Sequence, residues 1–155
     1  MNKNIILSLD QGTTISGYAV FQNGALTASG VLKAKAKDKV EDRMFDMAAQ
    51  INEVINSCQP NEIIVEEPFA KVNIRVFQIL CKFLGMVLYM GHIKNIPVIS
   101  YGASVWRSEI GLKGKNRPEQ KQKAIDYVKE KFNIECTDDE AEAILIGTAH
   151  LSRIK

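Results

Sequence analysis

The apolar positions of the chain follow two periods, which predict a mixture of strands and helices. Short apolar runs predict strands at residues 4–10, 17–21, 28–33, 61–66 and 96–100. Longer segments, in which apolar residues recur every three or four positions, predict helices at residues 38–57, 74–94, 103–110, 118–131 and 138–153. An Asn-Gly pair at 23–24 predicts a tight turn between the second and third strands.

The order of these elements indicates the fold class. Three strands follow one another directly at the start, which predicts an antiparallel meander. The later strands alternate with helices, which is typical of parallel strands covered by helices. We therefore expect an α/β fold, a mixed five-stranded sheet with helices on both faces. The chain has 155 residues and no internal repeat or linker, so we expect one domain over residues 1–155.

Composition narrows the class of protein only slightly. A hydrophobic content of 46%, a charged content of 25% and a net charge of +2 are ordinary for a globular protein. The three cysteines show no CxxC spacing, which argues against a zinc site or a disulfide framework and favours a reducing compartment. We expect a cytoplasmic protein because the first apolar run stops at Asp10 and does not resemble a signal peptide. We expect residues 74–94 to form a buried helix rather than a membrane span, since Lys82 interrupts them.

Acidic residues at the ends of predicted elements carry the chemical signal. Asp10 ends the first strand and Glu66 ends the fourth. The last helix begins with "TDDEAEAILIG", in which Asp139 and Glu142 are three residues apart and share a face. Carboxylates held against a sheet need a cation to compensate them, and Mg²⁺ prefers oxygen ligands. These acids therefore predict a metal site.

Some neighbouring acids have a simpler explanation. Thr137 is a plausible helix N-cap, and Glu140 stands where a capping box requires an acid. We assign Asp138 and Glu140 to this role and to the helix dipole. A solvent-exposed position and a metal ligand are equally expected for Glu67. We expect Trp106 in the core.

The chain resembles the RuvC family of Holliday junction resolvases, in the RNase H-like superfamily. The resemblance rests on "LSLDQGTTISGYAVF", "IIVEEPFAKVN", "IPVISYGASVWRSEIG", a Lys-rich loop and "DDEAEAILIG", in that order over essentially the whole chain. It is similar above all to small phage enzymes of this type, which would place it in the cytoplasm of a bacterial host. The resemblance implies an RNase H-like fold and a homodimer that cuts four-way DNA junctions by paired nicks, leaving 5′-phosphates.

The resemblance also implies roles for individual residues. The metal-binding acids of the family fall on Asp10, Glu66, Asp139 and Glu142, which would hold two Mg²⁺ ions, with Mn²⁺ able to substitute. Glu142 stands where bacterial members have an aspartate, and Asp138 is an alternative to Asp139. The basic active-site residue falls on Lys121, with Lys123 as the alternate. The catalytic set is thus Asp10, Glu66, Asp139, Glu142 and Lys121.

Further positions are expected to contact DNA or a second subunit. Phe69 matches an aromatic residue that engages the junction, and helix 74–94, with its small Gly85, matches the dimer interface. Lys and Arg outnumber acids between residues 113 and 131, as phosphate binding requires. The expected DNA-binding residues are Phe69, Lys71, Lys113, Lys115, Arg117, Lys121 and Lys123. The lysines between 33 and 39 are equally well explained as soluble surface.

Three other functions remain open. "DQGTT" at 10–14 resembles the phosphate loop of sugar kinases, but those enzymes close two domains around ATP and no second phosphate motif is found. A nuclease that cuts the RNA strand of a hybrid, or a resolvase-like DNase that acts on forks and flaps, would have a similar metal site. A non-catalytic junction-binding protein is disfavoured because all four acidic positions are filled.

Overall fold

A computed structural model describes residues 2–70 and 73–155. Its centre is a five-stranded sheet with the order β3-β2-β1-β4-β5. The strands are β1 (Ile5–Asp10), β2 (Ile15–Gln22), β3 (Ala25–Lys33), β4 (Glu62–Glu66) and β5 (Val98–Tyr101). The first three pair antiparallel, whereas β4 and β5 run parallel to β1. The expected mixed sheet is confirmed.

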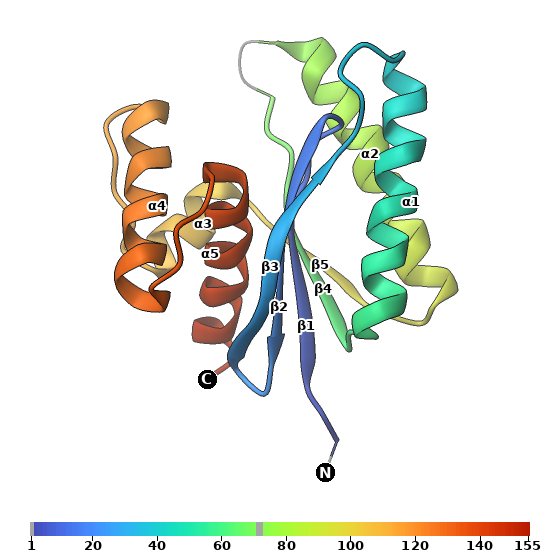
Figure 1. Ribbon diagram of the computed structural model, residues 1–155. Coiled ribbons are helices and arrows are strands. Elements are labelled where there is room, and N and C mark those ends of the chain that lie inside the picture. Colours follow the sequence, from blue (N-terminus) through green and yellow to red (C-terminus); the bar gives the residue numbers. More distant parts are fainter. Residues whose placement is uncertain (1, 71–72) are drawn as a thin grey trace.

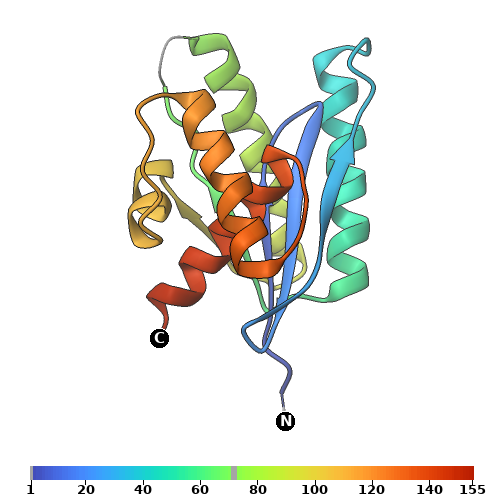
Figure 2. The ribbon, with the colours of Figure 1, turned by 60° about the vertical axis from the view of Figure 1, so that its left-hand side comes forward.

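Helices cover both faces of the sheet, as expected. They are α1 (Val40–Cys58), α2 (Ile74–Ile93), α3 (Ala103–Glu109), α4 (Arg117–Phe132) and α5 (Asp138–Arg153). Figure 1 shows α1 and α2 on one face and α3, α4 and α5 on the other. Figure 2 shows α4 lying over α5, which itself packs on β1 and β2. The predicted boundaries differ by at most a few residues; β5, for example, begins at Val98 rather than 96 because Pro97 has no N–H to donate.

The central strand β1 is buried on both sides, because its alternate side chains enter two separate cores. Leu7 and Leu9 face α1 and α2 and pack with residues such as Met47 and Phe83. Ile6 faces the other way and packs with the apolar stripe of α5 and with Trp106. Such a two-sided core is typical of a parallel strand between helical layers.

Helix α5 lies unusually close to the sheet. A Cβ on Gly147 would overlap the ring of Phe21, so only glycine permits this approach. The Ser8 hydroxyl of β1 donates a hydrogen bond to the Ala143 carbonyl at 2.6 Å, which fixes the helix on the strand. As a result every residue from 141 to 150 is buried.

The expectation that residues 74–94 form a buried helix is correct for only one face. Residues such as Phe83 and Val87 are buried against the core, but Ile74 and Tyr89 are 69% and 65% exposed. By length and composition, α2 is the one helix within residues 2–70 and 73–155 that could cross a membrane. It packs against α1 and β5, and the outer face that exposes large apolar side chains such as Ile74 and Tyr89 is left uncovered by the described residues.

Candidate active site

Asp10 and Glu66 lie side by side at the carboxyl ends of the neighbouring strands β1 and β4. Strands β1 and β4 run parallel, with Leu9 opposite Val65, and each acid is the next residue along its strand. The carboxyl ends of both strands therefore bring the two side chains to the same place. The sequence-based prediction that each of these acids ends a strand is confirmed.

The start of α5 brings two more acids to these strand ends. The Thr137 side chain accepts a hydrogen bond from the Glu140 N–H, as expected of an N-cap. Burial raises the pKa of Asp10 well above its usual value, and the charges of Glu142, Glu66 and Asp139 raise it further. The four predicted acids are therefore close enough for their charges to act on one carboxyl group.

Two of these acids carry raised pKa values of their own. Burial raises the pKa of Glu66, although a hydrogen bond from Trp106 opposes that effect. Burial also raises the pKa of Asp139, followed by the charge of Asp138. Both pKa values are raised although nearby cations oppose the effect: Arg107 and Arg117 lower the pKa of Glu66, and Lys121 and Arg117 lower that of Asp139. The nearby positive charge therefore does not fully offset the cost of ionising these carboxyl groups, and a bound cation would favour their ionised forms.

Trp106 is buried in the core as expected, but it also has a polar contact that the sequence analysis missed. Its indole Nε1 donates a hydrogen bond to Glu66 Oε2 at 2.6 Å. A usable signal was present, because a buried indole N–H needs an acceptor.

Two arginines contact Glu142, whose side chain is only 3% exposed. Arg117 Nη1 lies 2.7 Å from Oε1, and Arg117 Nη2 donates to Oε2 at 2.9 Å. Arg107 Nη2 lies 3.6 Å from Oε1. Arg117 is one of the predicted DNA-binding residues, and its guanidinium contacts Glu142 here, whereas Arg107 was not predicted as a functional residue. Charge alone did not distinguish either of them from the other basic residues.

Two further acids in the first turn of α5, Asp138 and Glu140, have partners outside the helix. Lys121 Nζ lies 2.7 Å from Asp138 Oδ2, and this hydrogen bond lowers the pKa of Asp138. Asp138 thus has its own cation, unlike Asp139. Glu140 does not complete the expected capping box; its carboxylate accepts a hydrogen bond from the Ser29 hydroxyl at 2.8 Å, because β3 lies within reach.

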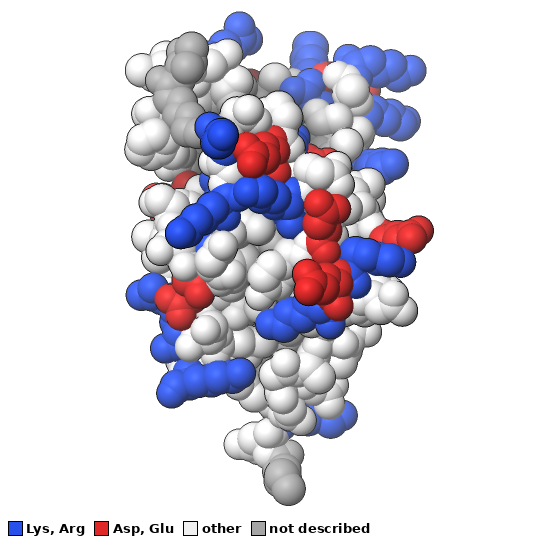
Figure 3. Space-filling model, turned by 90° about the vertical axis from the view of Figure 1, so that its left-hand side faces the viewer, with Lys and Arg blue, Asp and Glu red and all other residues white. Residues whose placement is uncertain are grey.

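The other expected DNA-binding residues lie after β4, in the loop before α4 and on α4. Phe69 is 73% exposed, and Lys113 and Lys115 are exposed in the loop before α4. Lys123 pairs with Glu119 at 3.1 Å on the surface of α4. Lys71 lies outside the described residues. Figure 3 shows the face that carries α3, α4 and α5, where acidic side chains are bordered by Lys and Arg.

The donor set fits a hard divalent cation, because every candidate ligand is a carboxylate oxygen. As the side chains stand, no three of the Asp, Glu, His or Cys residues among the described ones form a ready-made metal cluster. Both oxygens of Glu142 instead contact Arg117. The chemistry of the site fits a metal ion, and Glu142 could join Asp10, Glu66 and Asp139 as a ligand only by giving up its contacts with Arg117.

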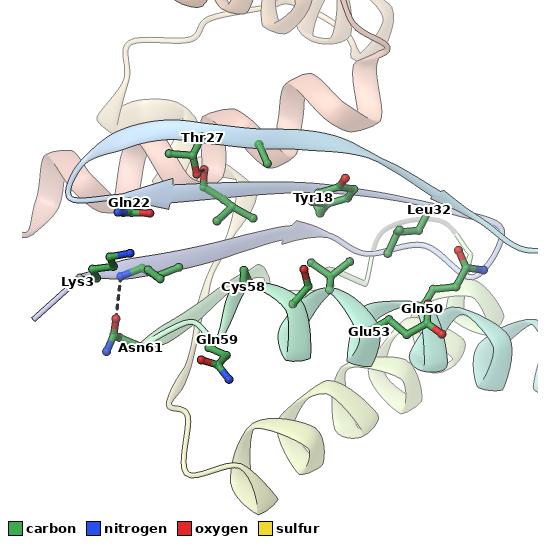
Figure 4. Close-up of a pocket in the computed structure, with 15 residues that line it drawn as sticks. Lys3, Tyr18, Gln22, Thr27, Leu32, Gln50, Glu53, Cys58, Gln59 and Asn61 are labelled. Atoms are coloured by element: carbon green, nitrogen blue, oxygen red, sulfur yellow. Dashed lines mark hydrogen bonds between the residues drawn. The ribbon is translucent and has the colours of Figure 1, made fainter.

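A hollow away from these acids lies on the face of the sheet that α1 covers. Figure 4 shows it between β2, β3 and α1, where Tyr18, Leu32 and Gln50 are among its lining residues. Its lining contains no group of converging acids, so it is not the candidate active site.

Comparisons with known proteins identify the family. The family model described as crossover junction endodeoxyribonuclease RuvC matches residues 6–150. A protein of this name from Dehalococcoides mccartyi is 28% identical over 152 residues, which covers 96% of this chain and 91% of that protein. One from Dechloromonas aromatica is 28% identical over 151 residues, covering 94% and 83%.

Solved structures agree on the fold. The chain superposes on Thermus thermophilus RuvC, determined in complex with a Holliday junction substrate, with a TM-score of 0.78. The two sequences are 19% identical, and the match covers 97% of this chain and 94% of the other. A sheet of this topology, with acids gathered at the ends of β1 and β4 and a family match over nearly the whole sequence, shows that the chain belongs to the RuvC family of crossover junction endodeoxyribonucleases.

Proposed function

We propose that this chain is a metal-dependent endodeoxyribonuclease that resolves four-way DNA junctions. One observation of the structure carries the proposal: the Asp10 carboxyl group is buried among the charges of Glu66, Asp139 and Glu142. Membership of the RuvC family supports the substrate, since its members are named for crossover junction cleavage.

The acids would hold two Mg²⁺ ions, and Mn²⁺ can substitute because it accepts the same oxygen ligands. When bound, such a pair activates a water on one side of a phosphodiester and stabilises the leaving oxygen on the other. Asp10 is central on the sheet, so it would serve both ions. Glu66 would serve one ion, and Asp139 with Glu142 the other.

The basic residues of the site would orient the scissile phosphate. Arg107 and Arg117 already lie against Glu142, and a guanidinium suits bidentate contact with phosphate oxygens. Lys121 stands at the rim, where its ammonium can approach a nonbridging oxygen. The exposed Lys113, Lys115 and Lys123 would bind the flanking backbone, as Lys71 would, and Phe69 would engage bases at the junction.

A homodimer through α2 would match the two-fold symmetry of the junction. The outer face of α2 exposes Leu88 and Tyr89, at 46% and 65%. Gly85 lies on the same side, and a Cβ there would meet nothing within 4 Å among the residues that the structure describes. An interface between two copies would bury this apolar face and place one site on each of two opposed strands. We place the enzyme in the cytoplasm.

The test is cleavage of a synthetic immobile four-way junction with Mg²⁺, beside duplex, flap, fork and RNA–DNA hybrid controls. Asp10→Asn is expected to lower cleavage by at least about 100-fold while junction binding survives. The matched control is Asp46→Asn, the same change on α1, on the other side of the sheet. It should cleave like the unmodified protein.

The pattern of cleavage separates the candidate functions. Paired nicks on opposed strands of the junction would support a resolvase. Cleavage of forks and flaps as well would indicate a broader branched-DNA nuclease. Cleavage of the hybrid alone would move the function to a ribonuclease, and junction binding without any cleavage would indicate a non-catalytic protein.

A further inference from the structure

We propose that Trp106 is a positioning residue for metal binding, because its indole N–H fixes one oxygen of Glu66 and leaves the other free for the ion. This inference rests on the proposed metal site. Trp106 itself does not touch the metal or the DNA; it acts through Glu66.

The hydrogen bond between these residues has the geometry of a strong contact. Trp106 Nε1 donates to Glu66 Oε2 at 2.6 Å, and the tryptophan side chain is fully buried. An indole has one donor and no acceptor, so it can satisfy only one carboxylate oxygen. Turning Glu66 away would leave a buried N–H without a partner, which costs roughly 1–3 kcal/mol. The carboxylate is therefore held in one orientation.

The ring that carries this donor is itself fixed. Trp106 packs in the core between the sheet and α5, together with Ile64 and Ile144. The guanidinium carbon of Arg107 lies 4.9 Å from the centre of the indole ring. Because these contacts hold the tryptophan ring in place, its hydrogen bond also restricts the movement of the Glu66 carboxylate.

Neighbouring residues of α3 thereby contact acids on two different elements. Trp106 holds Glu66 at the end of β4, and Arg107 lies 3.6 Å from Glu142 on α5. Both acids act electrostatically on Asp10. Helix α3 is thus placed to set the spacing of carboxylates on either side of Asp10 before a metal ion arrives.

Residues that orient metal ligands typically contribute about 10–100-fold to metal affinity. We therefore expect Trp106→Phe, which removes the N–H, to weaken Mn²⁺ binding at least about tenfold. The loss should be in metal affinity, so cleavage by the variant should recover at high metal concentration. A purely structural defect would not recover in this way.

The experiment measures Mn²⁺ binding to the full chain without DNA, by isothermal titration calorimetry and by the spin resonance of free Mn²⁺. Trp106 is the only tryptophan of the chain, so its fluorescence in the unmodified protein reports directly on an ion bound beside Glu66. The same feature permits replacement of Trp106 by benzothienylalanine, an isostere in which sulfur stands in place of the N–H.

Phe21→Leu is the control for stability, because Phe21 is fully buried in the same core and its ring lies beside Gly147, in the middle of α5. We expect Trp106→Phe and the isostere to lose Mn²⁺ affinity, and Phe21→Leu to unfold at a lower temperature while keeping it. Unchanged affinity in both tryptophan replacements would overturn this inference alone. If the unmodified protein and Asp10→Asn bound Mn²⁺ equally weakly, the metal site itself would fail, and the inference with it.

Discussion

The backbone of Asp139 lies directly against Gly17, so closely that a Cβ on residue 17 would overlap the Asp139 carbonyl oxygen. Gly17 is on β2, where it pairs with Asp10 of the neighbouring strand. A single missing side chain therefore lets the first turn of α5 approach the strand that carries Asp10. The approach of Asp139 to Asp10 therefore depends on the absence of a side chain at Gly17.

Gly17→Ala should therefore damage both stability and activity. The added methyl group must push the start of α5 away from the sheet, and overpacking of this kind costs typically about 1–3 kcal/mol. Thermal unfolding should show a lower melting temperature, and junction cleavage should fall because Asp139 and Glu142 move away from Asp10.

Gly102→Ala is the matched control for this change. A Cβ at Gly102 meets nothing within 4 Å, and its backbone φ of −63° suits any residue. This variant should unfold and cleave nearly like the unmodified protein. If Gly17→Ala behaved like Gly102→Ala, the close contact with α5 would have no role in assembling the site.

The stability of the metal-free protein should depend on pH through Asp10. Burial and the neighbouring carboxylates raise its pKa in the folded protein above the ordinary value of 3.8. The folded state then binds more protons than the unfolded state, so stability falls as pH rises from that value through the raised pKa. At pH values above the raised pKa, Asp10 is ionised in the folded protein as well, and the loss of stability reaches its full value.

Asp10→Asn cannot ionise, so it should remove this loss. In chelator, the variant should be more stable than the unmodified protein at neutral pH, and the difference should shrink as the pH falls toward about 4. Thermal unfolding across this range checks the prediction, with Asp46→Asn as the control. Lower stability of Asp10→Asn at every pH would contradict the account of Asp10 as a destabilising carboxylate.

The positions of Asp10 and Glu66 could be predicted from the sequence because strand ends are local features. An apolar run that stops at an acid marks the end of a buried strand, and parallel pairing then brings two such ends together. The cap of α5 at Thr137 was predictable for the same reason, since an N-cap depends on a few consecutive residues. The layers of the fold followed from the order of the strands and helices.

The side-chain partners were not predictable in this way. Arg117 begins α4 and Lys121 lies one turn further along, yet Arg117 contacts Glu142 whereas Lys121 contacts Asp138. Which of them points inward depends on how α4 packs over α5, which no local pattern encodes. The bond from Trp106 to Glu66 likewise joins residues 40 positions apart.

The outer face of α2 provides a test of the dimer. Leu88→Glu would place a charge on an exposed apolar face, so the variant should still fold but should elute as a monomer. Light scattering after gel filtration measures the mass. Junction cleavage should change from paired nicks to single, uncoupled nicks, because each monomer carries one site.

Ile154→Glu is the control for this substitution, since Ile154 is exposed to a similar degree, 54%, but follows the end of α5. It should leave the mass and the paired nicks unchanged. A dimeric Leu88→Glu would exclude this part of α2 from the interface.

The pair between Arg117 and Glu142 predicts competition between a guanidinium and a metal ion. Arg117→Ala leaves the buried Glu142 with only Arg107, at 3.6 Å. We expect the metal-free variant to lose about 1–3 kcal/mol of unfolding free energy, less than a fully buried pair costs because the Arg117 side chain is 42% exposed. The control is Lys123→Ala, which breaks a surface pair with Glu119 and should cost less than about 1 kcal/mol.

Addition of Mn²⁺ then distinguishes two roles for Glu142. If it is a metal ligand, the ion replaces the missing guanidinium, and Mn²⁺ should raise the melting temperature of Arg117→Ala by more than that of the unmodified protein. The variant would also bind Mn²⁺ more tightly, because no arginine has to be displaced. An equal shift in both proteins would mean that Glu142 stays with its arginines when the ion binds, and the metal site would then consist of Asp10, Glu66 and Asp139 alone.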